Sequence, residues 1–194
     1  MKRKVLIICA CGSKKGFTYT MCSEARDGFL DKGFEVEVVY PINMDISHCT
    51  GCGSCEGSGV CIIDDDMQRI YDSFANSDVV IMCTPIHYSG PSSVIKTVID
   101  RFQTLWPRGS SGPSYMACMM CGGDAKPEFR GAMHVFKALS ITAGSKWLGE
   151  LKISGTDARS PSDIKDECRT FVSSIVSMVG SGQDTCQMSG VHNA

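Results

Sequence analysis

Apolar residues recur along the chain in two patterns that alternate from end to end. Short, nearly continuous apolar runs lie at 4–10, 34–40, 78–83, 115–121 and 147–153. Such runs are typical of parallel strands that are buried on both faces. The run at 34–40 alternates in part between apolar and charged residues, which indicates a strand at the edge of a sheet. The sequence therefore predicts five strands.

Between these runs, apolar residues follow the period of an amphipathic helix. The expected helices lie at 18–32, 66–76, between Pro91 and Pro107, at 129–144 and from 160 onward. The third has the clearest stripe, which consists of Val94, Ile95, Val98, Ile99, Phe102 and Leu105. Near its end, Phe102, Leu105 and Trp106 fit either the core or a subunit contact. Gly33 is placed to end the first helix, and Asp65 with Gln68 resembles a capping box at the start of the second.

Strands that alternate with helices predict an α/β fold. We expect a doubly wound, five-stranded parallel sheet in three α/β/α layers, with strand order 2-1-3-4-5. One domain should span 1–180, with a cysteine-rich loop at 41–63 and a polar C-terminal tail at 181–194. Ligands of such sheets bind at the carboxyl ends of the strands, beside the point where the strand order reverses.

Three loops leave those strand ends, at 11–18, 84–90 and 121–124. The first has glycines, hydroxyls and two lysines before a helix, which favours a phosphate group, although it matches no established nucleotide fingerprint. In the second, Tyr88 is placed to stack on a flavin or to pack at a subunit contact. In the third, Gly122 and Gly123 allow close backbone approach to a ligand or simply form a tight turn.

The residues expected to bind a cofactor come from all three loops. They are Cys11, Ser13, Lys15, Gly16, Phe17, Thr18, Pro85, Ile86, His87, Tyr88, Ser89, Gly122 and Gly123. None of them is assigned as a catalytic acid or base.

Four cysteines crowd the long loop at 41–63, in the pattern C-x2-C-x2-C-x5-C. They are Cys49, Cys52, Cys55 and Cys61. Tandem spacing of this kind is ferredoxin-like and favours a [4Fe-4S] cluster held by four thiolates. Zinc fits less well, because four-cysteine zinc sites usually combine two separated C-x2-C pairs. Disulfides and unliganded thiols are the other two alternatives.

Composition and charge limit the class of protein and the cellular compartment that we expect. The chain has 194 residues, 12 cysteines and a net charge of −2. Nearly balanced charge gives no reason to expect nucleic acid, and no apolar stretch approaches the roughly 20 residues of a membrane helix. We therefore expect a soluble, cytoplasmic protein with reduced thiols. Cys9, Cys83 and Cys168 follow apolar patterns and are expected to be buried as small hydrophobic residues.

Three segments resemble a known family. The segments 4–18 (KVLIICACGSKKGFT) and 84–102 (TPIHYSGPSSVIKTVIDRF), with the cysteine run and the following Asp64-Asp65-Asp66-Met67, are similar to NAD(P)H-dependent FMN reductases of flavodoxin-like fold. The compact cysteine run resembles the iron–sulfur flavoprotein branch of that family. The resemblance covers roughly residues 1–130 and weakens toward the C-terminus.

This resemblance implies cofactors and partners. It implies FMN in the pocket of the three loops and a [4Fe-4S] cluster on the four cysteines, with NAD(P)H or ferredoxin as the electron donor. It also implies a homodimer or tetramer in which the cluster of one subunit approaches the flavin of another. The acceptor would be a small molecule such as an oxygen species or a quinone.

The first loop departs from the family's pattern. The usual Ser-Pro-Arg aligns with Cys11, Gly12 and Ser13, so that a hydroxyl becomes a thiol and a guanidinium is lost. Lys14 or Lys15 can compensate only as a point charge, and weaker FMN binding is expected. Two other functions stay open: a cluster-free NAD(P)H-dependent FMN or quinone reductase, and a non-enzymatic redox or metal sensor.

Overall fold

The computed structural model describes residues 2–107 and 112–181. Its strands are β1 (Lys4–Cys9), β2 (Glu35–Val39), β3 (Val79–His87), β4 (Gly90–Pro91), β5 (Tyr115–Cys121) and β6 (Lys146–Ile153). The order is β2-β1-β3-β5-β6 with all these pairs parallel, while β4 pairs antiparallel with β3. The predicted order 2-1-3-4-5 is confirmed, and β4 is an additional short strand.

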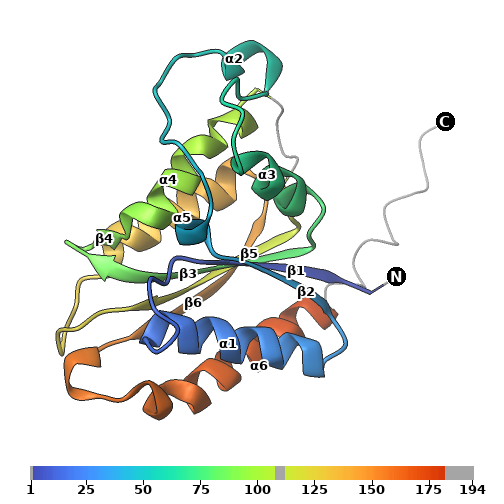
Figure 1. The fold of residues 1–194 in the computed structure, drawn as a ribbon. Helices are drawn as coiled ribbons and strands as arrows, with labels where there is room; N and C mark the ends of the chain where they lie inside the picture. The colour runs from blue at the N-terminus through green and yellow to red at the C-terminus, as the bar shows by residue number, and fades with distance from the viewer. Residues whose placement is uncertain (1, 108–111, 182–194) are drawn as a thin grey trace.

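Helices cover both faces of the sheet. They are α1 (Phe17–Asp31), α2 (Cys55–Ser58), α3 (Met67–Ala75), α4 (Ser93–Arg101), α5 (Arg130–Thr142) and α6 (Lys165–Ser181), with short 3-10 turns η1 (Pro41–Asn43), η2 (Phe102–Leu105), η3 (Thr156–Ala158) and η4 (Pro161–Ile164). Figure 1 shows α1 and α6 on one face and α3, α4 and α5 on the other. The three layers are therefore as predicted. The tail expected at 181–194 lies outside the described residues beyond Ser181.

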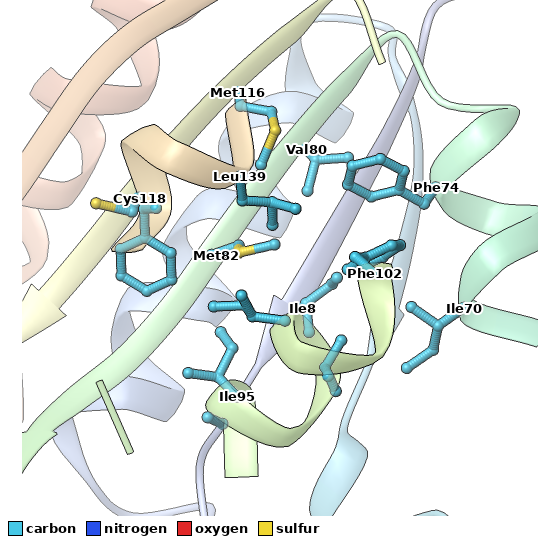
Figure 2. Close-up of a cluster of buried hydrophobic side chains, with 14 of the residues drawn as sticks. Ile8, Ile70, Phe74, Val80, Met82, Ile95, Phe102, Met116, Cys118 and Leu139 are labelled. Carbon is cyan, nitrogen blue, oxygen red and sulfur yellow. The ribbon is translucent and has the colours of Figure 1, made fainter. Parts of the chain in front are cut away.

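Two apolar cores, one on each face, hold the layers together. Because successive strand residues point to opposite faces, Leu6 and Ile8 belong to the core under α3, α4 and α5, while Val5 and Ile7 belong to the core under α1 and α6. Figure 2 shows Ile8, Val80 and Met82 of the first core packed among helix side chains. The expected burial of Cys9, Cys83 and Cys168 is confirmed, since each has 0% exposure.

The turn η2, which follows α4, shows whether its apolar side chains belong to the core or to a subunit contact. Phe102 and Leu105 fitted either the core or a subunit contact, and both are buried in the core. The Phe102 ring packs at 4.4 Å, centroid to centroid, from that of Phe74. Trp106 follows them and remains 68% exposed. Within the described parts of the chain, no helix is long and apolar enough to cross a membrane.

The third strand runs farther than its apolar pattern suggested. We expected it to end at Cys83 and to be followed by a loop, but β3 continues to His87 and turns back into β4. Tyr88 and Ser89 form this two-residue turn with positive φ values of 49° and 61°. Positive φ at both central residues is the requirement of a type I′ hairpin, which usually selects Asn or Gly. The second loop is thus a hairpin with a strained tip.

This hairpin rests on the start of α5, which makes a testable prediction. The Ala132 N–H donates to the Ser89 carbonyl at 3.2 Å, and a Cβ on Gly131 would overlap that same oxygen. Gly131→Ala should therefore lower the free energy of unfolding by about 1–3 kcal/mol, although alanine is the better helix former. Urea denaturation measures it.

Gly180→Ala is the matched control for this substitution, because a Cβ at that helical position meets no atom within 4 Å. It should be neutral or raise the free energy of unfolding by about 0.4–1 kcal/mol. Equal effects of the two substitutions would show that the hairpin does not rest on α5.

Candidate functional site: a four-cysteine pocket and a flavin edge

The cysteine loop leaves β2, passes through η1 and folds back over the α3 and α4 layer. Gly51 and Gly53 have φ values of 66° and 74°, so the backbone turns sharply on both sides of Cys52. Residues that carry a Cβ rarely adopt this backbone conformation, whereas glycine reaches it without steric cost. Cys55 then begins the single turn of α2, which Gly59 ends in a left-handed conformation. The glycines between the cysteines therefore let a short segment curl on itself.

All four cysteines of the run line one pocket. Its volume is about 340 Å³, and its wall also includes Arg101, Gln103 and Trp106. Cys52 is exposed, whereas Cys49, Cys55 and Cys61 are half-buried. His48, which directly precedes Cys49, is exposed and is not among the residues that line this pocket. The four cysteines of the run therefore share one hollow, and their assignment as metal ligands stays a prediction.

The thiols differ in how readily they ionise. Hydrogen bonding to Ser54, whose Oγ lies 3.4 Å from Cys52 Sγ, lowers the pKa of Cys52. Burial raises the pKa of Cys55, and the neighbouring cysteines add to that effect. Cys52 is therefore more readily ionised than Cys55.

A buried ion pair closes the base of the cysteine loop. Arg101, at the end of α4, places Nη1 2.6 Å from Asp65 Oδ2 and Nη2 3.1 Å from Asp65 Oδ1. The same guanidinium donates to the carbonyls of Ser47 and Ile63, at 2.8 and 3.2 Å. These two residues lie just before and just after the cysteine run. Arg101 therefore ties together both ends of the loop.

The attraction between the charges of Arg101 and Asp65 is strong because their side chains are only 0% and 5% exposed. Burial alone would raise the pKa of Asp65, but hydrogen bonds from Arg101 and from the N–H groups of Ser47 and Met67 hold it below its ordinary value. Burial likewise disfavours the charge on Arg101, yet its hydrogen bonds to Asp65 raise its pKa. Both groups are therefore charged at neutral pH.

Asp65 also corrects a detail of the predicted capping box. Its Oδ1 accepts the N–H of Met67, at 3.0 Å, whereas the N–H of Gln68 donates to its backbone carbonyl. The role of Arg101 was not inferred from the sequence. One signal was present: Arg101 lies seven residues after Val94 and so falls on the apolar face of the helix, where an unpaired charge would be costly.

The donor set of the pocket fits an iron–sulfur cluster better than a single ion. Within the described ranges, no three His, Cys, Asp or Glu side chains are close enough to hold one metal ion. A four-iron cube binds one thiolate at each of four separate corners, so its ligands surround a hollow instead of converging on one point. Four thiols around one pocket match that arrangement. Arg101 Nε adds a buried donor without a hydrogen-bond partner in the same wall.

The first loop presents backbone amides at the start of α1. Gly16 occupies the N-cap position, and no side chain caps the helix. Gly12, Ser13, Lys14 and Lys15 are exposed, while Cys11 is 7% exposed. A pocket beside this loop is lined by 11–14 together with Tyr40, Ile42 and Asn43. Uncapped amides and two lysines suit a phosphate.

Some predicted cofactor residues make contacts within the protein instead. Thr18 is buried, and its Oγ1 lies 3.3 Å from Cys121 Sγ. A Cβ on Gly122 would approach Pro127 to 2.6 Å, and one on Gly123 would approach an oxygen of Asp157 to 2.6 Å. The paired glycines are therefore needed for packing at this turn, whatever they bind.

The hairpin residues are arranged along a gradient of exposure. Pro85 and Ile86 are half-buried, His87 and Ser89 are exposed, and Tyr88 is completely exposed at the tip. Strand register places Cys9 beside Cys83 and Pro85 beside Cys121. The hairpin and the other two loops therefore leave the sheet at the carboxyl ends of its strands. We call this region the flavin edge, after the cofactor expected there, and define it by residues 11–18, 84–91 and 121–124.

The cysteine pocket and the flavin edge lie at opposite ends of α4. The cysteine loop follows β2 and so leaves the sheet at the same carboxyl strand ends as the flavin loops, which by itself would place it beside them. Figure 1 shows instead that α2 lies over the far end of α4, whereas β4 lies near its beginning. The whole of α4 and the following turn η2 run between the two places. Within one subunit, the loop therefore carries its cysteines away from the flavin edge.

Curated proteins that are similar to this chain are named iron-sulfur flavoproteins. The chain is 34% identical over 116 residues to an iron-sulfur flavoprotein of Archaeoglobus fulgidus, which covers 59% of this chain and 53% of the relative. It is 32% identical over 71 residues to an iron-sulfur flavoprotein of Methanosarcina thermophila, covering 37% of each. The alignments thus span about half of the first relative and a little over a third of the second.

Solved structures show the same fold. An NAD(P)H:quinone oxidoreductase from Methanothermobacter marburgensis superposes with a TM-score of 0.72 at 15% identity, over 91% of this chain and 98% of that one. The family described as NADPH-dependent FMN reductase matches residues 3–154. This chain belongs to the NADPH-dependent FMN reductase family, and over part of their length it is similar to proteins named as iron-sulfur flavoproteins.

Proposed function

We propose that this protein is an FMN-dependent oxidoreductase that passes electrons between FMN and a [4Fe-4S] cluster on Cys49, Cys52, Cys55 and Cys61. One observation supports this most: all four cysteines line a single pocket in a chain of an FMN reductase family. When bound, FMN exchanges a hydride or single electrons, and the cluster exchanges single electrons.

The chain's own residues position these groups. The amides at the start of α1, with Lys14 and Lys15, attract the phosphate. The turn at Tyr88 and Ser89 presents an exposed ring beside the flavin edge, and its strained backbone is a common feature of functional sites. At the other centre, Arg101 and Asp65 fix the ends of the loop that carries the thiolates. No side chain is required as an acid or base.

The separation of the two centres favours an oligomer. Because α4 and η2 lie between the cysteine pocket and the flavin edge, efficient transfer requires a second subunit that brings its own flavin edge nearer. We therefore propose a homodimer or tetramer, with NAD(P)H or ferredoxin as the donor and an oxygen species or quinone as the acceptor. The exposed Trp106, at the pocket wall, is available for such a contact.

Anaerobic purification tests the proposal directly. We expect FMN together with about four iron and four sulfide per chain, and the absorbance of both chromophores should bleach on reduction. Iron and sulfide assays, flavin extraction and a visible spectrum measure this. Flavin without iron would contradict the cluster, and iron without flavin, even after incubation with FMN, would contradict the flavin.

The second candidate is a cluster-free NAD(P)H-dependent FMN or quinone reductase. One observation favours it: the family model that matches residues 3–154 is described as NADPH-dependent FMN reductase, an activity that requires no cluster. This function requires turnover by iron-free protein. NAD(P)H oxidation that is equally fast before and after iron is removed by chelation would favour it over the first.

A further inference from the structure

Among the described residues, the wall of the cysteine pocket contains one permanent positive charge. Arg101 lines the pocket, its side chain is fully buried, and its Nη1 and Nη2 are occupied by Asp65, Ser47 and Ile63. Its Nε is buried and has no hydrogen-bond partner within the described ranges. A buried donor without an acceptor is unusual, and it leaves part of the guanidinium charge uncompensated beside the pocket.

The pocket would gather negative charge when it is loaded. Four thiolates around a [4Fe-4S] core leave the site with a net negative charge, which grows by one when the cluster accepts an electron. A nearby cation stabilises the more negative state, and in a poorly solvated site this effect is stronger than in water. The charge of Asp65, bonded to the same guanidinium, works in the opposite direction.

On the basis of the proposed function, we propose that Arg101 is a positioning residue that raises the reduction potential of the cluster, and that Asp65 limits this rise. Reduction adds one electron, supplied in a titration by dithionite, to the iron of the cluster, and no bond to the protein forms or breaks. The pair thus both closes the loop and sets how easily the cluster accepts an electron.

The charge contribution can be separated from the structural one by two substitutions that remove charges of opposite sign. Arg101→Gln removes a positive charge from the pocket wall, and Asp65→Asn removes a negative one. The readout is the midpoint potential of the cluster, from an anaerobic titration of the purified holoprotein followed by electron paramagnetic resonance. Purely structural roles would shift both variants in the same direction.

We expect Arg101→Gln to make the reduction equilibrium constant roughly tenfold less favourable, which is about 59 mV for a one-electron couple. Asp65→Asn should shift it at least threefold in the other direction. Arg101→Lys keeps the charge and should remain within threefold of the wild type. Arg69→Gln, which removes an arginine from an exposed ion pair with Glu37, is the matched control and should not shift it.

Each outcome decides the matter. Shifts of the same sign in Arg101→Gln and Asp65→Asn, or shifts no larger than that of Arg69→Gln, would overturn this inference while leaving the proposed function intact. Absence of iron from the wild type would overturn both. If Arg101→Gln alone loads no iron, Arg101→Lys and Asp65→Asn must still behave as stated, and otherwise the inference is overturned.

Discussion

Asp65→Ala should lower the free energy of unfolding by about 3–5 kcal/mol. The substitution leaves the Arg101 guanidinium, whose side chain has 0% exposure, without its buried counter-ion. It also removes the acceptor for the N–H groups of Ser47 and Met67. Removal of one partner from a buried pair costs more than the pair itself contributes, because the remaining charge stays buried. Urea denaturation of the apoprotein measures the loss.

Asp64→Ala is the control for this prediction, because Asp64 is the exposed neighbour of Asp65. A surface substitution of this kind should change stability by no more than about 0.5 kcal/mol. Similar effects of the two substitutions would contradict a special role for Asp65.

The difference in the free energy of unfolding between Asp65→Ala and the wild type should become smaller as the pH falls. The pKa of Asp65 is lower in the folded protein, so its contribution is fully present above its unfolded value of about 3.9 and is lost as the pH falls through the folded value. Chemical denaturation at a series of acidic pH values measures the difference. A difference that stays constant to the most acidic pH at which the protein folds would contradict the ion-pair explanation.

The sequence was sufficient to predict the sheet because its strands are buried on both faces. In β1, residues 5–9 point alternately to the two sides of the sheet and are all apolar, so this continuous run indicated a strand with parallel neighbours. The sequence pattern could not reveal that β3 continues to His87. Thr84 and Pro85 interrupt the apolar pattern, and the turn at Tyr88 and Ser89 lacks the Asn or Gly that normally signals a hairpin.

The site was predictable where spacing determines proximity and not where it depends on tertiary contacts. The four cysteines follow one another so closely between Cys49 and Cys61 that they must lie near one another, so one pocket was expected. The position of that pocket was not, because it depends on the bonds between Arg101 and the two ends of the loop. These bonds join residues far apart in the sequence, such as Ser47 and Arg101, and direct the loop over the end of α4.

Cys61→Ser should reduce the iron content of anaerobically purified protein from about four per chain to less than one. Cys61 is the last ligand of the proposed cluster and follows a five-residue gap. No other cysteine of the run can therefore take its place without rearranging α2. Serine has nearly the same shape, and Cys61 is only half-buried, so the fold itself should persist. Iron and sulfide assays measure the loss, and a thermal unfolding scan verifies the fold.

Cys118→Ser is the matched control, because it makes the same change in a cysteine of β5 that has 0% exposure in the core. There the new hydroxyl is buried, which should lower the free energy of unfolding by about 1–3 kcal/mol but leave the iron content unchanged. The two variants thus separate cysteines that bind metal from cysteines that fill the core. Full iron content in Cys61→Ser would contradict the four-cysteine cluster, and iron loss in both would indicate a general effect of destabilisation.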